Sequence, residues 1–270
     1  MLRKIVAQKK KEVEQLYART SIADMERQIA SLSPCRSLAA RFMNRNRPVG
    51  VIAEVKKASP SRGLIRDPFE PLSIARAYEA ADVEGMSVLT DETFFQGSLA
   101  YLQQIRESLQ APIPLLRKDF IIDPLQLYEA RAYGADVVLL IAAILDRRQL
   151  RTLAEEAKAL GLETLVEVHT VEELATVLDA VTPDLLGVNN RDLQTFQTSL
   201  HTTFALLENL PDSLVTISES GVHAPEQIER LAQAGLDGVL VGEHFMRQSN
   251  IEEAVYELVG SGRPIMEEQR

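Results

Sequence analysis

From residue 49 onward the chain repeats one unit eight times, a short apolar run followed by a polar-faced helical pattern of about ten residues. The apolar runs, such as D-V-V-L-L-I, are nearly continuous, which is typical of parallel strands that helices cover on both faces. Eight such units within about 220 residues match an α/β fold of the (β/α)8 type, the TIM barrel, in number and size. The predicted strands are Val49–Val55, Met86–Leu89, Pro114–Leu116, Asp136–Ile141, Glu163–Val168, Leu185–Val188, Ser213–Ser218 and Gly238–Val241. The predicted helices are Leu72–Ala81, Ser98–Leu109, Pro124–Tyr133, Arg147–Leu160, Val171–Ala180, Thr203–Leu210, Ala224–Ala234 and Ile251–Val259.

A doubly wound open sheet is the competing architecture for the same alternation. It usually has fewer strands, and its dinucleotide-binding version carries G-x-G-x-x-G after the first strand. Neither this motif nor G-x-x-x-x-G-K-[ST] occurs in the sequence, which favours the barrel. We therefore expect a single barrel domain over residues 1–270, with residues 1–48 as an added helical segment. The expected helices of this segment are Leu2–Thr20, Ile22–Ser31 and Ser37–Phe42.

Composition narrows the class of partner. The 29 basic and 39 acidic residues give a net charge of −10, which argues against nucleic acid because that binding needs clustered lysine and arginine. The single cysteine, Cys35, excludes a disulfide framework and indicates a reducing, cytoplasmic location. The sequence has no apolar run long enough for a membrane span and no secretory signal at its start. A small molecule is the expected partner.

Charged residues stand at the carboxyl ends of four predicted strands, all odd-numbered. They are Glu54 and Lys56 on the first, Lys118 after the third, Glu167 on the fifth and Glu219 after the seventh. Alternate strands of a (β/α)8 barrel contribute side chains to one layer, and chemistry lies at the carboxyl ends of the strands. Because buried charges are costly unless they are paired or used, two lysines and three carboxylates in one layer predict an acid–base site. A plug of structural salt bridges is the alternative.

Glycines follow the last two predicted strands, in Ser220-Gly221-Val222 and Val241-Gly242-Glu243. The loops after strands seven and eight are where such barrels often bind phosphate through backbone N–H groups. The segment Ser59-Pro60-Ser61-Arg62-Gly63 adds hydroxyls and a cation near the same mouth. Glycine is also ordinary in strand-to-helix turns, and the Ser59–Gly63 segment equally fits a plain mobile loop.

Several other residues carry weaker signals. His169 has no partner at metal-ligand spacing, so we expect no metal site and interpret it as a polar residue at a helix start. The run Lys9–Lys11 predicts a solvated helix face. Phe94, Phe95 and Phe120 fit either walls over an aromatic substrate or ordinary packing.

The strand ends closely resemble one family. The segments I-A-E-V-K-K-A-S-P-S, L-T-D-E-T-F-F-Q-G, L-L-R-K-D-F, L-V-E-V-H, G-V-N-N-R-D-L and S-E-S-G-V resemble the indole-3-glycerol phosphate synthases of tryptophan biosynthesis, in the right order along the chain. The resemblance implies a barrel enzyme without metal or organic cofactor. It implies conversion of 1-(2-carboxyphenylamino)-1-deoxyribulose 5-phosphate into indole-3-glycerol phosphate, carbon dioxide and water.

The resemblance also implies residue roles, carried over position by position. Lys118 matches the general acid for ring closure, Glu167 and Glu54 match the assisting carboxylates, and Lys56 matches a lysine that holds an anionic group. Glu219 belongs to the same catalytic set. The implied substrate-orienting residues are Asn189 and Arg191, and the implied phosphate positions are Ser59, Ser220, Gly221 and Gly242. The implied ring wall is Phe120 and Leu139, and Leu240 is a further implied substrate-binding residue. Two departures are Glu243, where some members carry serine, and Thr93, which replaces a frequent lysine.

An anionic substrate requires a locally positive mouth on an acidic chain, and we expect Lys56, Lys118, Arg62 and Arg191 to provide it. Two rival functions remain open. A class I aldolase would use a barrel lysine as a Schiff base, and a non-catalytic phosphosugar-binding barrel would need no acid–base residues. For any of these functions we expect a monomer or weak homo-oligomer.

Overall fold

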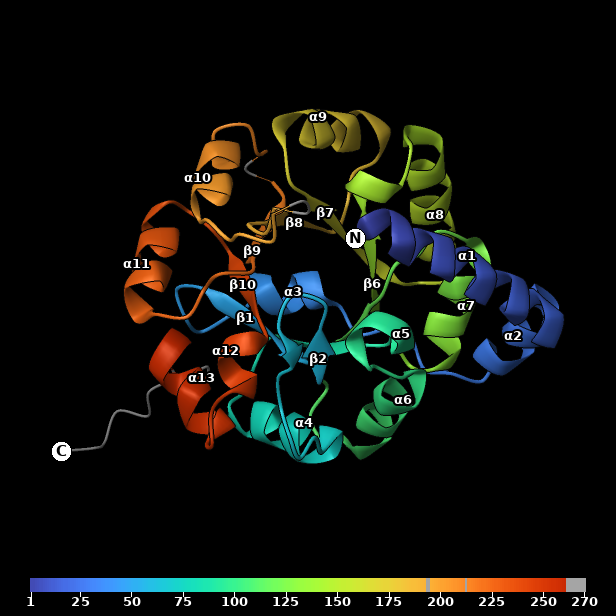
Figure 1. The fold of residues 1–270 in the computed structure, drawn as a ribbon, viewed down its shortest axis with the longest axis horizontal. Coiled ribbons are helices and arrows are strands. Elements are labelled where there is room, and N and C mark those ends of the chain that lie inside the picture. Colours follow the sequence, from blue (N-terminus) through green and yellow to red (C-terminus); the bar gives the residue numbers. More distant parts are fainter. Residues whose placement is uncertain (193–194, 212, 261–270) are drawn as a thin grey trace.

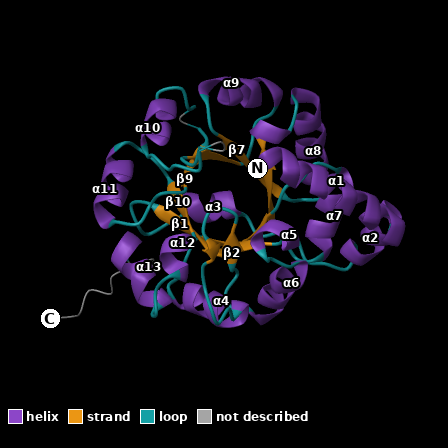
Figure 2. Ribbon diagram, in the orientation of Figure 1, coloured by secondary structure: helices purple, strands orange, loops and turns teal. Residues whose placement is uncertain are grey.

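The computed structural model of the chain describes residues 1–192, 195–211 and 213–260. Within them, eight parallel strands close into a barrel (Figures 1 and 2), in the order β1-β10-β9-β8-β7-β6-β5-β4. The predicted α/β barrel is therefore confirmed. The barrel strands are β1 (Gly50–Val55), β4 (Gly85–Leu89), β5 (Leu115–Lys118), β6 (Val137–Ile141), β7 (Glu163–Val168), β8 (Leu185–Asn189), β9 (Val215–Glu219) and β10 (Gly238–Val241).

A ring of helices surrounds the barrel (Figure 2), and each corresponds to a predicted helix. The bounds of α9 and α13 are as predicted, and those of the others differ by at most three residues at either end. Asp123 caps the helix that begins at Pro124, as an aspartate before a proline at the first helical position does. The ring helices are α4 (Pro71–Ala80), α6 (Leu99–Ser108), α7 (Pro124–Ala132), α8 (Arg147–Ala159), α9 (Val171–Ala180), α10 (His201–Leu207), α11 (Pro225–Gln233) and α13 (Ile251–Val259). None of the helices in the described ranges combines the length and apolar composition that crossing a lipid bilayer requires.

Successive side chains along the strands point alternately into two apolar clusters. Ile52, Leu116, Leu165 and Ile217 belong to a cluster inside the barrel. Val51, Leu115 and Val166, each next to one of them in the sequence, belong to the other cluster, which includes residues of the ring helices. Because side chains two residues apart share a face, the inward residues fix the direction of the charged residues that follow them.

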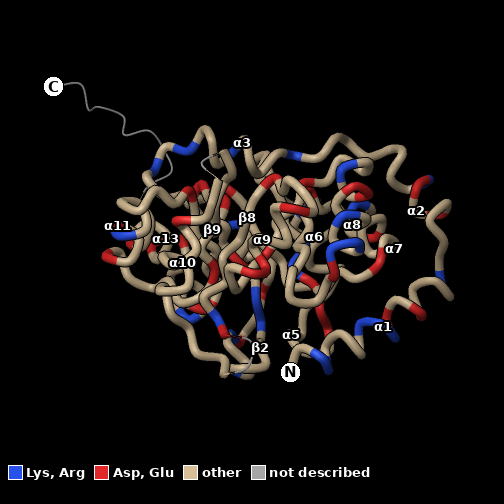
Figure 3. Tube along the Cα trace, turned by 90° about the horizontal axis from the view of Figure 1, so that it is seen from above, with Lys and Arg blue, Asp and Glu red and all other residues tan. Residues whose placement is uncertain are grey.

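The N-terminal segment forms α1 (Leu2–Arg19), α2 (Ile22–Ile29) and α3 (Leu38–Met43). Leu38 and Phe42 of α3 pack into the inner cluster and close one end of the barrel. A β-carbon at Gly50 or Gly238 would collide with the Phe42 ring, so these strand starts need glycine for the close approach. Figure 3 shows α3 at one end of the molecule and the N-terminus at the other. Catalytic side chains can therefore gather only at the end opposite α3.

Helix α1 runs from the open end of the barrel toward α7 (Figure 1). The expectation of a solvated Lys9–Lys11 face is wrong for Lys9, which is buried; Lys10 and Lys11 are exposed. The Lys9 ammonium lies 3.0 Å from the Asp91 carboxylate and 2.8 Å from that of Asp119. Burial alone would lower the pKa of Lys9, but these carboxylates outweigh it and raise the pKa. These ion pairs tie α1 to the loops after β4 and β5.

Short elements that the sequence analysis did not predict occupy the strand-to-helix loops. They are β2 (Ala58–Ser59) and β3 (Gly63–Leu64), α5 (Glu92–Phe95), the 3-10 turn η1 (Ala142–Ile144) and α12 (Glu243–Met246). Strands β2 and β3 pair as an antiparallel ribbon, so the Ser59–Gly63 segment has regular structure. Residues 261–270, which the expected domain includes, lie outside the described residues.

Candidate active site

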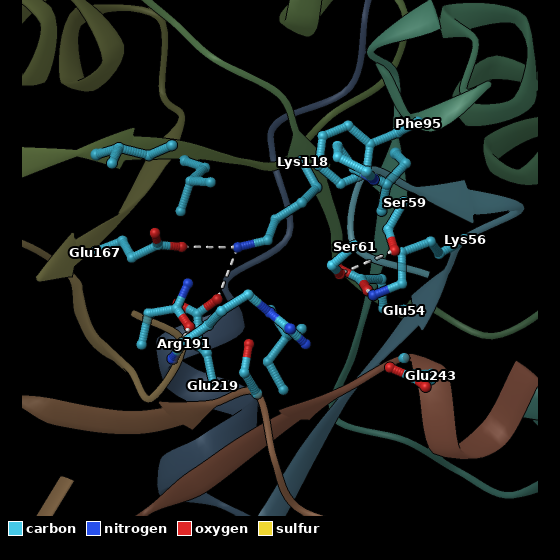
Figure 4. A pocket seen from close by; sticks show the side chains of 18 of the residues that line it. Glu54, Lys56, Ser59, Ser61, Phe95, Lys118, Glu167, Arg191, Glu219 and Glu243 are labelled. Carbon is cyan, nitrogen blue, oxygen red and sulfur yellow. Dashed lines mark hydrogen bonds and ion pairs between the residues drawn. The ribbon is translucent and has the colours of Figure 1, made fainter. Parts of the chain in front are cut away.

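A cavity of about 200 Å³ opens at the carboxyl ends of the barrel strands (Figure 4). Every catalytic and substrate-binding residue that the family resemblance implies contributes to its lining, whereas Arg62 does not. These residues are Glu54, Lys56, Ser59, Lys118, Phe120, Leu139, Glu167, Asn189, Arg191, Glu219, Ser220, Gly221, Leu240 and Gly242. Strands far apart in the sequence therefore bring this set together in one place.

Lys118 lies at the centre of the charged part of the cavity. Strand β5 continues two residues past its predicted end, and its alternation turns Lys118 inward while Arg117 pairs on the outer side with Glu129. The Lys118 ammonium donates hydrogen bonds to Glu167 at 3.0 Å and to Glu219 at 2.7 Å, as the dashed lines in Figure 4 mark. The result is one ammonium between two nearly buried carboxylates.

The surroundings separate the pKa values of these three groups. Burial alone would lower the pKa of Lys118, but the charges of Glu167 and Glu219 outweigh it and raise the pKa. Burial raises the pKa of Glu219 to about 7, and repulsion from Glu167 adds to this effect. Burial also acts on Glu167, but there Lys118 and His169 outweigh it and lower the pKa. The surroundings thus favour the charged form of Lys118 and the ionised form of Glu167, and they favour the protonated form of Glu219 relative to an ordinary glutamate.

Glu219 keeps one carboxyl oxygen without a hydrogen-bond partner. Its Oε2 accepts from Lys118, whereas its buried Oε1 accepts from no residue that the structure describes. A side chain at Gly187 on the neighbouring strand would occupy the space of this oxygen, so glycine there makes room for it. A buried, unpartnered oxygen on a carboxyl group that titrates near neutrality is suited to hold a proton.

A second charged pair lies across the cavity. The Lys56 ammonium donates to the Glu54 carboxylate, both on the face of β1 that points inward. A β-carbon at Gly242, after β10, would meet this carboxylate and would lie 3.0 Å from the Lys56 ammonium. The pair therefore lies directly beside the loop after the last strand.

The loop after β9 has a constrained backbone. Ser220 and Gly221 have φ angles of 69° and 84°, in the left-handed region. For a serine this conformation is strained, and such strain is typical of ligand sites. The Asn190 amide donates to the carbonyl oxygen of Ser220 at 3.0 Å and holds the loop. In the segment after strand β1, which pairs with β10, the Ser59 and Ser61 hydroxyls lie 3.4 Å apart.

The cations at the rim differ in how their charges are compensated. Arg191 donates to the carbonyl oxygen of Phe196 at 3.1 Å, and its backbone N–H donates to Asn189 at 3.0 Å. Arg62 instead lies 3.2 Å from the carboxylate of Glu243, which reduces its contribution to the positive mouth that the sequence analysis expects. The Glu243 carboxylate also lies 3.1 Å from Arg247.

One wall of the cavity is apolar. Phe95 of α5 packs against Phe120, with ring centroids 6.0 Å apart, so these two phenylalanines are wall residues. Phe94 is absent from the lining. Sequence reasoning missed other members of the wall, namely Ile141, Phe196, Met1, Leu2 and Ile5. Ile141 shares a face with Leu139, a signal that could have found it, whereas the N-terminal residues carry no such signal.

His169 follows β7 and contacts the acid–base cluster from behind. Its Nε2 lies 3.4 Å from Oε1 of Glu167, and its Nδ1 lies 3.2 Å from Glu173. The sequence correctly places His169 at a helix start, but its contacts with Glu167 and Glu173 were not predicted. Among residues 1–192, 195–211 and 213–260, no group of three or more His, Cys, Asp or Glu side chains is arranged to hold a metal ion.

The fold and the cavity together define an acid–base enzyme built on a (β/α)8 barrel, with its charged groups at the carboxyl ends of β1, β5, β7 and β9. The family model for indole-3-glycerol phosphate synthase matches residues 2–258. The chain belongs to this family.

Curated relatives agree with the family model along most of their length. The chain is 47% identical to the indole-3-glycerol phosphate synthase of Geobacillus sp. (strain WCH70) over 258 residues, covering 96% of each chain. It is 48% identical to that of Halalkalibacterium halodurans over 220 residues, covering 82% of this chain and 84% of the relative. Among solved structures, 3-hexulose-6-phosphate synthase from Salmonella typhimurium matches with a TM-score of 0.63 and 14% identity, covering 78% of this chain and 96% of the other. This last likeness shows the fold alone.

Proposed function

We propose that this chain closes, decarboxylates and dehydrates 1-(2-carboxyphenylamino)-1-deoxyribulose 5-phosphate, giving indole-3-glycerol phosphate, carbon dioxide and water. The observation that carries the proposal is the Lys118 ammonium, buried between Glu167 and Glu219 beside an apolar wall. A charged donor of this kind matches a reaction that develops negative charge on an oxygen while an aromatic ring lies close by.

In the first step, the ring carbon that bears the carboxylate attacks the ketose carbonyl carbon. Lys118 donates a proton to the carbonyl oxygen, which becomes a hydroxyl group. The oxygen is strongly basic once the carbon–carbon bond has formed, so an ammonium with a raised pKa still serves as the donor. Glu219, with a pKa of about 7 and 2.7 Å from the ammonium, returns a proton to Lys118.

Two losses complete the reaction. Carbon dioxide leaves, and its bonding electrons restore the aromatic ring. The new hydroxyl group then leaves as water after protonation, while a proton is removed from the neighbouring methylene carbon to form the indole double bond. Glu167, which is ionised, and Glu54 are the carboxylates that assist closure and this proton removal.

Binding of the two anionic groups follows from the rest of the lining. Ser59, Ser220, Gly221 and Gly242 hold the phosphate, with the left-handed backbone after β9 and the small residue after β10 as support. Lys56 holds an anionic group beside Glu54, and Arg191 and Asn189 orient the substrate carboxylate. Phe120, Leu139 and Leu240 form the surface for the ring.

The raised pKa of Lys118 argues against a Schiff-base aldolase. A lysine that attacks a carbonyl must be unprotonated, and its pKa must be lowered for that purpose. Here two carboxylates within 3.0 Å do the opposite.

We further propose that residues 1–270 act as one domain, with residues 1–48 as its extension. The buried Lys9 pairs and the closure of the barrel by α3 support this proposal. Three statements stay predictions. The partner is a phosphorylated small molecule and not nucleic acid, the protein is cytoplasmic, and it is a monomer or associates only weakly. Sedimentation of the purified protein at several concentrations tests the last of these.

The experiment that tests the function is turnover of the synthetic carboxyphenylamino-deoxyribulose phosphate, followed by indole fluorescence. We expect a fluorescent product and released carbon dioxide in equal amounts. Fluorescent product without carbon dioxide, or no product with the folded protein, contradicts the proposal.

A further inference from the structure

His169 lies between two carboxylates, directly behind the acid–base cluster. It follows β7, and its side chain is only 9% exposed. Its Nδ1 lies 3.2 Å from Oε2 of Glu173, an oxygen that also accepts the backbone N–H of His169 at 2.7 Å. Glu173 thus fixes both the main chain and the ring of this histidine.

The opposite nitrogen of the ring faces the active site. Nε2 lies 3.4 Å from Oε1 of Glu167, and it makes no hydrogen bond with any residue in the described ranges. The other oxygen of Glu167, Oε2, accepts from Lys118 at 3.0 Å. The two oxygens of Glu167 therefore have different neighbours, the ammonium at Oε2 and the imidazole near Oε1, and the Asn189 side chain also hydrogen-bonds this carboxylate.

The groups that face His169 are acidic. Glu167 comes from β7, Glu173 from α9 and Glu219 from β9, while η1, which packs on β7 and α9, brings only Ala-Ala-Ile. The nearest cation in this cluster is Lys118, beyond Glu167. Burial alone would lower the pKa of His169, but Glu173 and Glu167 outweigh it and raise the pKa. The imidazolium in turn helps to lower the pKa of Glu167.

Proton donation by Lys118 changes what Glu167 experiences. When Lys118 gives its proton to the substrate it becomes a neutral amine, and until Glu219 returns a proton to it, Glu167 lacks the cation 3.0 Å away. A buried carboxylate without a counter-ion takes up a proton, which would end its use as a base. His169 lies beside the other oxygen of Glu167 and does not take part in that proton transfer; when it is protonated, it favours the ionised form of Glu167.

We propose that His169, held by Glu173, is a positioning residue that keeps Glu167 ionised and correctly turned after Lys118 has given up its proton. The inference rests on the proposed function of the cavity. It assigns Glu173 the task of keeping the imidazole charged and facing the cluster. Removal of residues that orient metal ligands typically changes activity by about 10- to 100-fold, and we expect an effect of that order for a residue that orients Glu167.

The test compares His169→Asn, Glu173→Gln and the control Glu172→Gln by the pH dependence of kcat. Glutamine at position 173 keeps an oxygen for the backbone N–H of His169 and loses the charge, while Glu172 is an exposed carboxylate next to it on α9. In His169→Asn, kcat should fall by about 10-fold or more while KM changes little. The acidic limb of its profile should move to higher pH, because Glu167 has lost a cation that lowers its pKa. Glu173→Gln should move the limb in the same direction by less, and Glu172→Gln should leave it unchanged.

If the wild-type enzyme is active and the acidic limb of the His169→Asn profile is not displaced, this inference is overturned even if kcat falls, while the proposed function stands. An equal displacement by Glu172→Gln also overturns it, because the effect would then be one of general charge. If His169→Asn fails to fold, Glu173→Gln decides the matter, since its side chain lies partly at the surface. A folded wild-type protein without turnover overturns the function itself, and this inference with it.

Discussion

Replacement of Lys118 by methionine removes the one ammonium that both Glu167 and Glu219 contact, at 3.0 Å and 2.7 Å. Methionine has a similar length, so the space stays filled. Loss of one partner from a buried ion pair costs about 3–5 kcal/mol of unfolding free energy when the remaining charge has no outlet. Here Glu219 already titrates at about 7, so it takes up a proton and the cost should lie below that range.

The effect on the reaction should be larger than the effect on folding. A positioned proton donor contributes a factor of about 10²–10⁴ in rate, which corresponds to about 3–5 kcal/mol of activation free energy. Because Lys118 acts on the carbonyl oxygen and the substrate anions are held elsewhere, kcat should fall by this factor while KM changes only a few-fold.

The assay is steady-state indole fluorescence, with thermal unfolding to confirm the fold. Lys158→Met is the matched control, because Lys158 is an exposed lysine on α8, away from the cavity. It should keep wild-type kcat. A folded Lys118→Met protein whose loss is confined to KM refutes the proton-donor role and makes Lys118 a binding residue.

Three further predictions concern Glu219, Gly242 and Lys9. Between its ordinary pKa of 4.5 and its raised pKa of about 7, Glu219 is protonated in the folded protein and ionised in the unfolded chain, so it makes stability fall as pH rises. The unfolding free energy of Glu219→Gln relative to wild type should therefore increase by up to about 3 kcal/mol as the pH rises from about 5 to about 8. The variant should also lose activity. A stability difference that is equal at these two pH values contradicts the buried-carboxyl argument. Gly242→Asp places a carboxylate beside the proposed phosphate loop and should weaken competitive inhibition by inorganic phosphate, whereas unchanged inhibition would mean that the anion binds elsewhere. Lys9→Met breaks buried ion pairs with Asp91 and Asp119 and should cost about 3–5 kcal/mol in urea unfolding, against less than about 0.5 kcal/mol for the exposed Lys10→Met control.

The barrel could be predicted because its signal is local and repeated. Each strand is an apolar run and each ring helix has a polar face, so the period of the sequence gives the architecture without knowledge of any long-range contact. The alternation of side chains along each strand also predicts which residues point into the site. Lys118, Glu167 and Glu219 each stand two residues after an inward apolar residue, and the structure brings them within hydrogen-bonding distance.

What could not be predicted depends on segments that meet only in space. Lys9 stands in a run of three lysines that suggests a solvated face, and its partners Asp91 and Asp119 lie on two distant loops. The lining by Met1 and Leu2 follows from the direction that α1 takes after the barrel has formed. The contact between His169 and Glu173 is different, because their spacing of four residues at a helix start was a local signal that could have revealed the pair.

The electrostatic character of the site has a similar origin. The number of carboxylates around the lysines follows from the sequence, and it correctly indicates a charged Lys118. The unequal pKa values of Glu167 and Glu219 do not follow from the sequence. They depend on which carboxylate contacts His169 and on which has an oxygen without a hydrogen-bond partner.

The central claim is that Lys118 gives a proton to the substrate and does not form a covalent bond with it. Borohydride added together with saturating substrate, followed by intact-mass measurement, tests this claim most directly, because reduction makes a Schiff base permanent. Two carboxylates hold Lys118 as an ammonium, so we expect the mass of the unmodified chain and no substrate-dependent loss of activity. An added mass that maps to Lys118 would contradict the account.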